Sequence, residues 1–198
     1  MYHVFMTQQP IIDIETSKII MNELLCRPKR LSITEYFNVL DPDELWQREL
    51  TCIKEGISLT SNVPKNININ LSSLPYFLEF TNLKWNGGLE IVEWGPNRRE
   101  IIEQLPNYIE QLKARGLQVW VDDLDPAMWD TWKDINVTGF KIKFNDVQNI
   151  EFLRKVQSSH KPLLIEQIET NEQKQFLHKY GLRFAQGYLF DQILFNLV

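Results

Sequence analysis

The chain lacks several features that mark common classes of protein. Its 198 residues contain two cysteines, Cys26 and Cys52, outside any C-x-x-C pair, which argues against a zinc site and a disulfide framework. A net charge of −5 offers no basic surface to duplex DNA or RNA. No apolar run approaches the roughly 18 residues that cross a bilayer, and the N-terminal MYHVFMTQQP has no signal-peptide pattern. We therefore expect one globular domain over residues 1–198, in a reducing cytoplasm and away from membranes.

The first part of the chain predicts a hairpin followed by a helix. Residues 3–14 and 18–25 are rich in Ile, Val and Met and flank a polar turn, which is typical of two antiparallel strands. Asp41 is a suitable N-cap for a helix that begins at Pro42. Residues 65–72 (KNININLS) alternate strictly and predict a strand with three asparagines on one face. That face fits a polar barrel lumen and a solvated sheet edge equally well.

From Lys65 onward, predicted strands alternate with predicted helices, which is typical of parallel strands with helical crossovers. Further strands are expected at residues 88–93, 117–121, 139–144, 162–169 and 183–190, and the main helices at 98–115, 147–158 and 171–180. With the hairpin they make about eight strands, the number that closes a TIM-like (β/α)8 barrel. An open doubly wound α/β sheet is the alternative, which the absence of a glycine-rich phosphate loop after these strands disfavours.

Polar side chains recur near the C-terminal ends of the predicted strands. Asp122 and Asp123 directly follow the apolar LQVWV, and two adjacent carboxylates repel each other unless a cation or proton lies between them. Alternatively, Asp123 only caps the next helix. The residues near strand ends are Glu23, Asn70, Glu90, Asp122, Asp123, Lys141, Glu166 and Gln186. In a barrel these ends meet at one mouth, where ligands bind.

This set predicts a site for divalent cations. Oxygen donors dominate it and it contains no histidine or cysteine, which favours magnesium, manganese or calcium over zinc. Two bridged divalent ions activate a water and stabilise a phosphoryl transition state, and Lys141 would complement the phosphate charge or orient the water. Arg27 is an alternative partner for the Glu23 carboxylate. The residues therefore suggest metal-assisted phosphodiester hydrolysis.

Eight short motifs follow one another along the chain: Gln9-Pro10-Ile11, Glu23-Leu24-Leu25 with Arg27, Asn70-Leu71-Ser72, Glu90-Ile91-Val92-Glu93, Asp122-Asp123, Lys141-Ile142, Glu166-Gln167-Ile168-Glu169 and Gln186-Gly187-Tyr188. In this order they resemble the motifs of the EAL domain, the cyclic di-GMP phosphodiesterase fold of bacterial signalling, over nearly the whole chain. Each motif is weak alone, but the ordered set is specific. The Glu-Leu-Leu signature and the short barrel are also similar to the EAL half of EAL–HDOD proteins, a branch that is often regulatory.

The resemblance implies a shortened TIM-like (β/α)8 barrel with an antiparallel first strand. It also implies hydrolysis of cyclic di-GMP to linear pGpG with two Mg or Mn ions. The positions that match the family's metal ligands are Glu23, Asn70, Glu90, Asp122, Asp123 and Glu166. Lys141 and Glu166 match the residues that act on the attacking water, and Gln9, Arg27 and Gln186 match positions that bind substrate.

The chain also departs from the family pattern. Residues 124–129 (LDPAMW) replace the family's F-G-T-G-Y-S-S loop, Lys143 replaces the aspartate of K-I-D, Gln167 replaces a glycine and Val92 replaces a threonine. Two functions therefore stay open. One is an active or weakened phosphodiesterase, and the other is an inactive regulatory module that binds cyclic di-GMP or a protein.

The replaced loop bears on possible partners. Trp129 and Trp132 lie three residues apart on a predicted short helix, so the Leu124–Trp132 region either exposes an aromatic surface to a protein partner or packs onto the barrel rim. A homodimer is a further alternative, which the loss of the family's loop puts in question.

Overall fold

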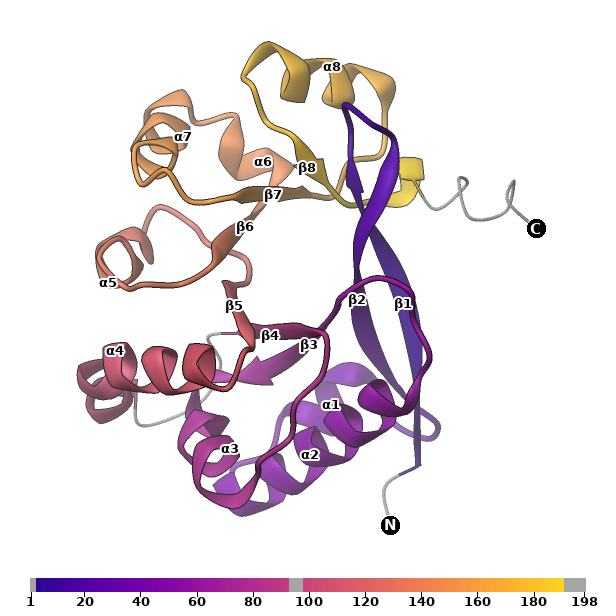
Figure 1. Cartoon of the computed structure of the whole chain (residues 1–198), viewed down its shortest axis with the longest axis vertical. Helices are drawn as coiled ribbons and strands as arrows, with labels where there is room; N and C mark the ends of the chain where they lie inside the picture. Colours follow the sequence, from indigo (N-terminus) through magenta and orange to yellow (C-terminus); the bar gives the residue numbers. More distant parts are fainter. Residues whose placement is uncertain (1–2, 93–97, 191–198) are drawn as a thin grey trace.

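The computed structural model describes residues 3–92 and 98–190, in which eight strands close a barrel in the order β1 to β8 (Figure 1). The strands are β1 (Val4–Asp13), β2 (Lys18–Pro28), β3 (Lys65–Asn70), β4 (Gly87–Val92), β5 (Gln118–Val121), β6 (Gly139–Lys143), β7 (Leu163–Glu166) and β8 (Phe184–Ala185). Strand β1 is antiparallel to both β2 and β8, and the other neighbouring pairs are parallel. The predicted (β/α)8-type barrel with an antiparallel first strand is confirmed.

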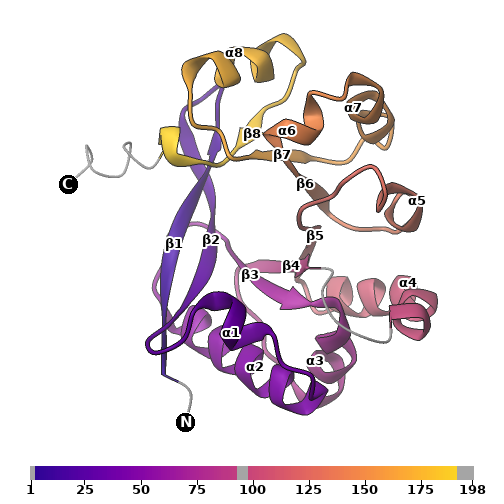
Figure 2. The same ribbon diagram turned by 180° about the vertical axis from the view of Figure 1, so that it is seen from behind.

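The helices lie outside the ring of strands, as the two opposite views show (Figures 1 and 2). They are α1 (Ile33–Phe37), α2 (Pro42–Ser58), α3 (Leu74–Phe80, after the 3-10 turn Leu71–Ser73), α4 (Arg98–Ala114), α5 (Trp129–Trp132), α6 (Phe144–Val147), α7 (Ile150–Gln157) and α8 (Asn171–Lys179). Asp41 caps α2 as predicted, because its carboxylate accepts hydrogen bonds from the N–H groups of Asp43 and Glu44. None of the helices in the described ranges is long and apolar enough to cross a membrane.

The two-residue period of the strands separates the core into an outer and an inner part. Side chains of one parity, such as Ile69, pack between strands and helices in the main apolar core. Side chains of the other parity face the lumen, where Ile11, Met21, Trp120 and Leu164 form a second apolar cluster. One step of two residues further along each of these four strands, the side chain is polar: Gln9 (in β1, which runs antiparallel), Glu23, Asp122 and Glu166. The fold thus places a polar layer directly on an apolar one.

Several predicted boundaries are wrong. Strand β8 has two residues instead of 183–190, because Gly187, with a φ of +148°, turns the chain away from the barrel. A β-carbon at Gly187 would lie 2.3 Å from the backbone N and O of Ile168, so only glycine fits this crossing. Strand β7 ends at Glu166 and β6 at Lys143, after which Phe144 begins α6. Glu93, predicted to end the strand at 88–93, lies outside the described residues.

Candidate functional site

Lys141 of β6 lies at the centre of a buried group of carboxylates. Its Nζ is 2.6 Å from Oε2 of Glu90 and 2.7 Å from Oδ1 of Asp122. It is also 2.9 Å from Oε1 of Glu166 and 3.1 Å from Oε2 of Glu23. The lysine and Glu90 are fully buried. We call these five residues the floor of the site. The four carboxylates come from β2, β4, β7 and the residue after β5, and all four contact the same ammonium group.

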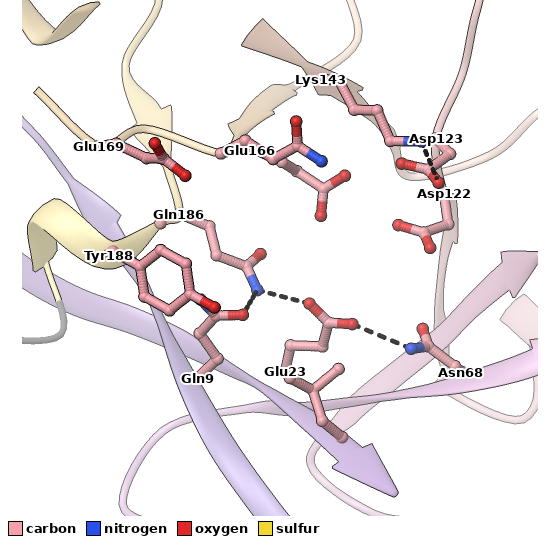
Figure 3. Close-up of a pocket in the computed structure, with 13 residues that line it drawn as sticks. Gln9, Glu23, Asn68, Asp122, Asp123, Lys143, Glu166, Glu169, Gln186 and Tyr188 are labelled. Atoms are coloured by element: carbon pink, nitrogen blue, oxygen red, sulfur yellow. Dashed lines mark hydrogen bonds and ion pairs between the residues drawn. The ribbon is translucent and has the colours of Figure 1, made fainter. Parts of the chain in front are cut away.

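Amide side chains hydrogen-bond two of the four floor carboxylates, Glu23 and Glu90. Asn68 of β3 donates to Oε1 of Glu23 at 2.9 Å, and Asn66 donates to Oε1 of Glu90 at 3.0 Å. Gln186 donates from Nε2 both to Glu23 and, at 2.9 Å, to Oε1 of Gln9, as Figure 3 shows. The asparagine face of β3 therefore lines the lumen, and the alternative of a solvated edge is wrong.

One lysine does not balance the carboxylates of the floor. Burial opposes ionisation of Glu23, but the charge of Lys141 and the amide hydrogen bonds outweigh it and hold the pKa of Glu23 below its usual value. Burial raises the pKa of Glu90 and of Asp122, and it raises the pKa of Glu166 to about 8 in spite of Lys141. The site therefore has an excess of buried acid groups, which either hold protons or receive a further cation.

A cavity of about 610 Å³ adjoins the floor, and Figure 3 shows side chains that line it. It is lined by Gln9, Glu23, Leu25, Asn68, Asp122, Asp123, Lys143, Glu166, Gln167, Glu169, Gln186, Gly187 and Tyr188. We call Asp123, Lys143, Gln167 and Tyr188, which line this cavity and are more exposed than the floor, the rim. Most of the lining is polar, so the cavity suits a polar, hydrogen-bonding ligand.

The residues present fit a divalent cation at the junction of floor and rim. Asp122, Asp123 and Glu166 each offer a carboxylate oxygen, and these oxygens lie within 4.8 Å of one another. Such hard oxygen donors are the ligands that magnesium, manganese and calcium take. Lys143 lies in the same place, since its Nζ is 2.6 Å from Oδ2 of Asp123 (Figure 3). This hydrogen bond raises the pKa of Lys143. The ammonium group of Lys143 and a metal ion would therefore both contact the carboxylate of Asp123.

Four of the predicted site residues do not line the cavity: Asn70, Arg27, Glu90 and the floor lysine Lys141. Oδ1 of Asn70 accepts hydrogen bonds from the N–H of Ser72 at 2.9 Å and from its hydroxyl at 2.7 Å, so Asn70 caps the turn after β3. Arg27 lies beside a smaller cavity and donates to the carbonyl of Cys26 at 3.1 Å. It forms no ion pair with Glu23 among those found in the described residues. Glu90 lies beneath the cavity.

Sequence reasoning missed two residues of the site. Asn68 lines the cavity two positions before Asn70, and strict alternation signals this because both asparagines share one face. In the sequence Lys143 is only a departure from the K-I-D pattern, and its contact with Asp123 has no local signal because Lys143 ends β6 whereas Asp123 follows β5. The other predicted residues, Gln9, Glu23, Asp122, Asp123, Lys141, Glu166 and Gln186, come together at the floor and cavity.

Of the two alternatives for Leu124–Trp132, the exposed aromatic surface is not the one found. Leu124 and Trp132 are fully buried. Trp129 is half-buried and meets the ring of Phe140 edge to face, with centroids 5.8 Å apart. The alternative, in which these residues pack onto the barrel, is the arrangement found.

No family model matches the chain, and no curated protein matches it. Its structure is nevertheless similar to solved structures of EAL domains. The FimX EAL domain from Pseudomonas aeruginosa bound to c-di-GMP matches with a TM-score of 0.77 and 15% identity, over 93% of this chain and 88% of that one. An EAL domain protein from Listeria monocytogenes matches with 0.73 and 21%, over 94% and 87%. Klebsiella pneumoniae BlrP1, in a calcium and c-di-GMP complex, matches with 0.72 and 16%, over 94% of this chain and 54% of BlrP1.

Proposed function

We propose that this chain, which has the EAL-domain fold, binds cyclic di-GMP in the cavity above Lys141 and hydrolyses it to linear pGpG with divalent cations, at a weakened rate. The observation that carries the proposal is the convergence of Glu23, Glu90, Asp122 and Glu166 on one buried lysine, next to a polar cavity of about 610 Å³. No purely structural need requires so many buried acids at one mouth, since burying an unpaired charge is costly.

The side chains have distinct roles in this proposal. Asp122, Asp123 and Glu166 would hold the divalent ion, with Glu23 as a further carboxylate of the cavity. When bound, Mg or Mn lowers the pKa of a water and stabilises charge on the phosphate. Lys141 keeps the floor carboxylates in place and offsets part of their repulsion. Glu166 would also accept the proton of the attacking water, once a bound cation offsets the burial that raises the pKa of this carboxyl.

Other predicted roles remain proposals with less support from the geometry. Gln9 and Gln186 present amides to the cavity and would bind the nucleotide. Asn70 would need to release Ser72 before it could bind a metal ion, and Arg27 would need to turn away from the Cys26 carbonyl to reach a phosphate.

A second candidate function is a regulatory module that binds cyclic di-GMP without hydrolysing it. The ion pair between Lys143 and Asp123 favours this candidate, because it occupies a carboxylate that the metal would use.

We also propose a cytoplasmic location and a single domain over residues 1–198. A homodimer is a further proposal, which light scattering of the purified chain tests.

Turnover separates the two candidates. Purified protein is incubated with cyclic di-GMP and Mn²⁺ or Mg²⁺, and pGpG is measured by chromatography. We expect slow release of pGpG that Glu166→Gln abolishes and Glu55→Gln, an exposed control, leaves unchanged. Calorimetry with calcium, the ion in the BlrP1 complex, measures nucleotide binding separately.

The outcomes are distinct. Binding without pGpG under either metal would overturn the phosphodiesterase and favour the regulatory module. Absence of binding in calorimetry as well would overturn both candidates.

A further inference from the structure

Two cysteines that are 26 positions apart in the sequence are in contact in the fold. Sγ of Cys52, in α2, lies 2.7 Å from Sγ of Cys26, near the end of β2. Both are free thiols; Cys26 is half-buried and Cys52 is buried. A disulfide needs a sulfur–sulfur distance of about 2.05 Å, so the two sulfurs would have to move closer together to form one.

The thiol pair lies close to the candidate site but is not part of it. It borders a cavity of about 90 Å³ that Leu25 and Asn68 also line, and these two residues form part of the wall of the larger cavity as well. Tyr36 of α1 packs beside the pair, with its hydroxyl 3.2 Å from the carbonyl of Arg48. The thiols therefore border a cavity that shares two wall residues with the larger one.

We propose that Cys26 and Cys52 form an oxidisable dithiol, which a low-molecular-weight disulfide such as oxidised glutathione converts reversibly into an intramolecular disulfide between β2 and α2. This inference does not depend on the proposed function. It needs only the contact between two free thiols and the access of solvent to one of them.

The reaction is a thiol–disulfide exchange in two steps. The Cys26 thiolate attacks one sulfur of oxidised glutathione, the glutathione S–S bond breaks, and one glutathione leaves and takes up a proton. Cys52 then loses its proton and attacks the Cys26 sulfur of the mixed disulfide, which releases the second glutathione as a thiol. Two protein thiols are oxidised and one small disulfide is reduced to two thiols.

The order of the steps follows from the surroundings of the two thiols. The hydrogen bond to Cys26 and burial raise the pKa of the Cys52 thiol. A neutral thiol is a poor nucleophile, so Cys52 does not start the exchange. Cys26 reaches solvent, and once it carries glutathione the sulfur of Cys52 is already next to it.

The test measures the exchange in the full chain. Protein is equilibrated in buffers of reduced and oxidised glutathione, quenched with acid, alkylated and weighed by mass spectrometry, both folded and in guanidinium. We expect a folded product that has lost two hydrogens and takes up no alkylating agent. Because folding favours a bond that fits the fold, its equilibrium constant should be at least about thirtyfold larger in the folded chain than in the unfolded one.

Three results would overturn the proposal: two alkylated cysteines at every glutathione ratio, a mixed disulfide at Cys26 as the final product, or an equilibrium constant no larger in the folded chain than in the unfolded one.

Variants of each cysteine provide the controls. Cys52→Ser should stop at the mixed disulfide, and folded Cys26→Ser should not react. Oxidised wild-type protein should melt roughly 5 °C higher or more, and dithiothreitol should reverse the shift. If a serine variant fails to fold, the comparison of folded and unfolded wild type decides alone.

Discussion

The floor and the rim of the candidate site balance their charges in different ways. On the floor, one fully buried lysine contacts four carboxylates, and all five residues match EAL motifs. On the rim, Lys143 forms an ion pair with Asp123, and 38% and 42% of these side chains are exposed. Two departures from the family pattern, Lys143 and Gln167, lie on the rim. The floor therefore matches the EAL motifs throughout, whereas the rim matches them at Asp123 and Tyr188 but not at Lys143 and Gln167.

The largest effect is expected from removing the cation of the floor. Lys141→Met keeps the volume but leaves four buried carboxylates without their partner, so it should lower the free energy of unfolding by about 3–5 kcal/mol at pH 7. The loss should be smaller at pH 5, where carboxyl groups protonate more easily. Urea denaturation measures both values. Lys155→Met, which removes an exposed pair with Glu151, is the control, and a loss as small as in the control would contradict this view of the floor.

A buried carboxylate without a lysine provides the comparison with the floor. Glu49 of α2 accepts a hydrogen bond from the N–H of Asn70 at 2.6 Å, and burial raises its pKa to about 7. Its pKa in the unfolded chain is lower, so the folded protein binds more protons between about pH 4.5 and 7, and stability falls as the pH rises through this range. Glu49→Gln should remove that fall and stabilise the protein at pH 8 by up to about 3 kcal/mol.

Glu55→Gln, on an exposed position of the same helix, should leave the pH dependence of unfolding unchanged. An unfolding free energy of Glu49→Gln that depends on pH as in wild type would mean that Glu49 ionises in the fold at no cost. Buried carboxylates in this protein would then not need a lysine partner, and the comparison with the floor would fail.

The rim prediction concerns metal affinity. Lys143→Met removes a cation 2.6 Å from Oδ2 of Asp123, so Mn²⁺ should bind severalfold and up to about tenfold more tightly. Calorimetry or the spin resonance signal of free Mn²⁺ measures this without any turnover. Lys155→Met again serves as the control. An unchanged affinity would show that Lys143 does not compete for Asp123.

The smallest effect is expected at Gln167, which has a φ of +60° where the family has a glycine. Gln167→Gly relieves this backbone conformation and should raise the free energy of unfolding by about 0.5–1 kcal/mol, measured by thermal melting. Ser17→Gly, with a φ of +56° in the β1–β2 turn, should give a similar gain. A difference in nucleotide affinity between the two variants would show that Gln167 contacts the ligand, because only Gln167 lines the cavity.

Much of the architecture could be predicted from the sequence because it depends on how apolar and polar residues alternate along short segments. Alternation along KNININLS fixes one asparagine face, and alternating strand and helix segments require parallel strands with crossovers. The same two-residue period places Glu23, Asp122 and Glu166 beyond the apolar layer of the lumen, so the polar mouth followed from the chain alone once a barrel was assumed.

The tertiary structure decided which of these groups meet. Asn68 and not Asn70 reaches the cavity, because Asn70 is held by Ser72. Lys143, at the end of β6, contacts Asp123, which follows β5. Cys26 of β2 contacts Cys52 of α2. Such contacts depend on strand register and helix packing between distant segments, and neither is encoded by the residues next to them in the sequence.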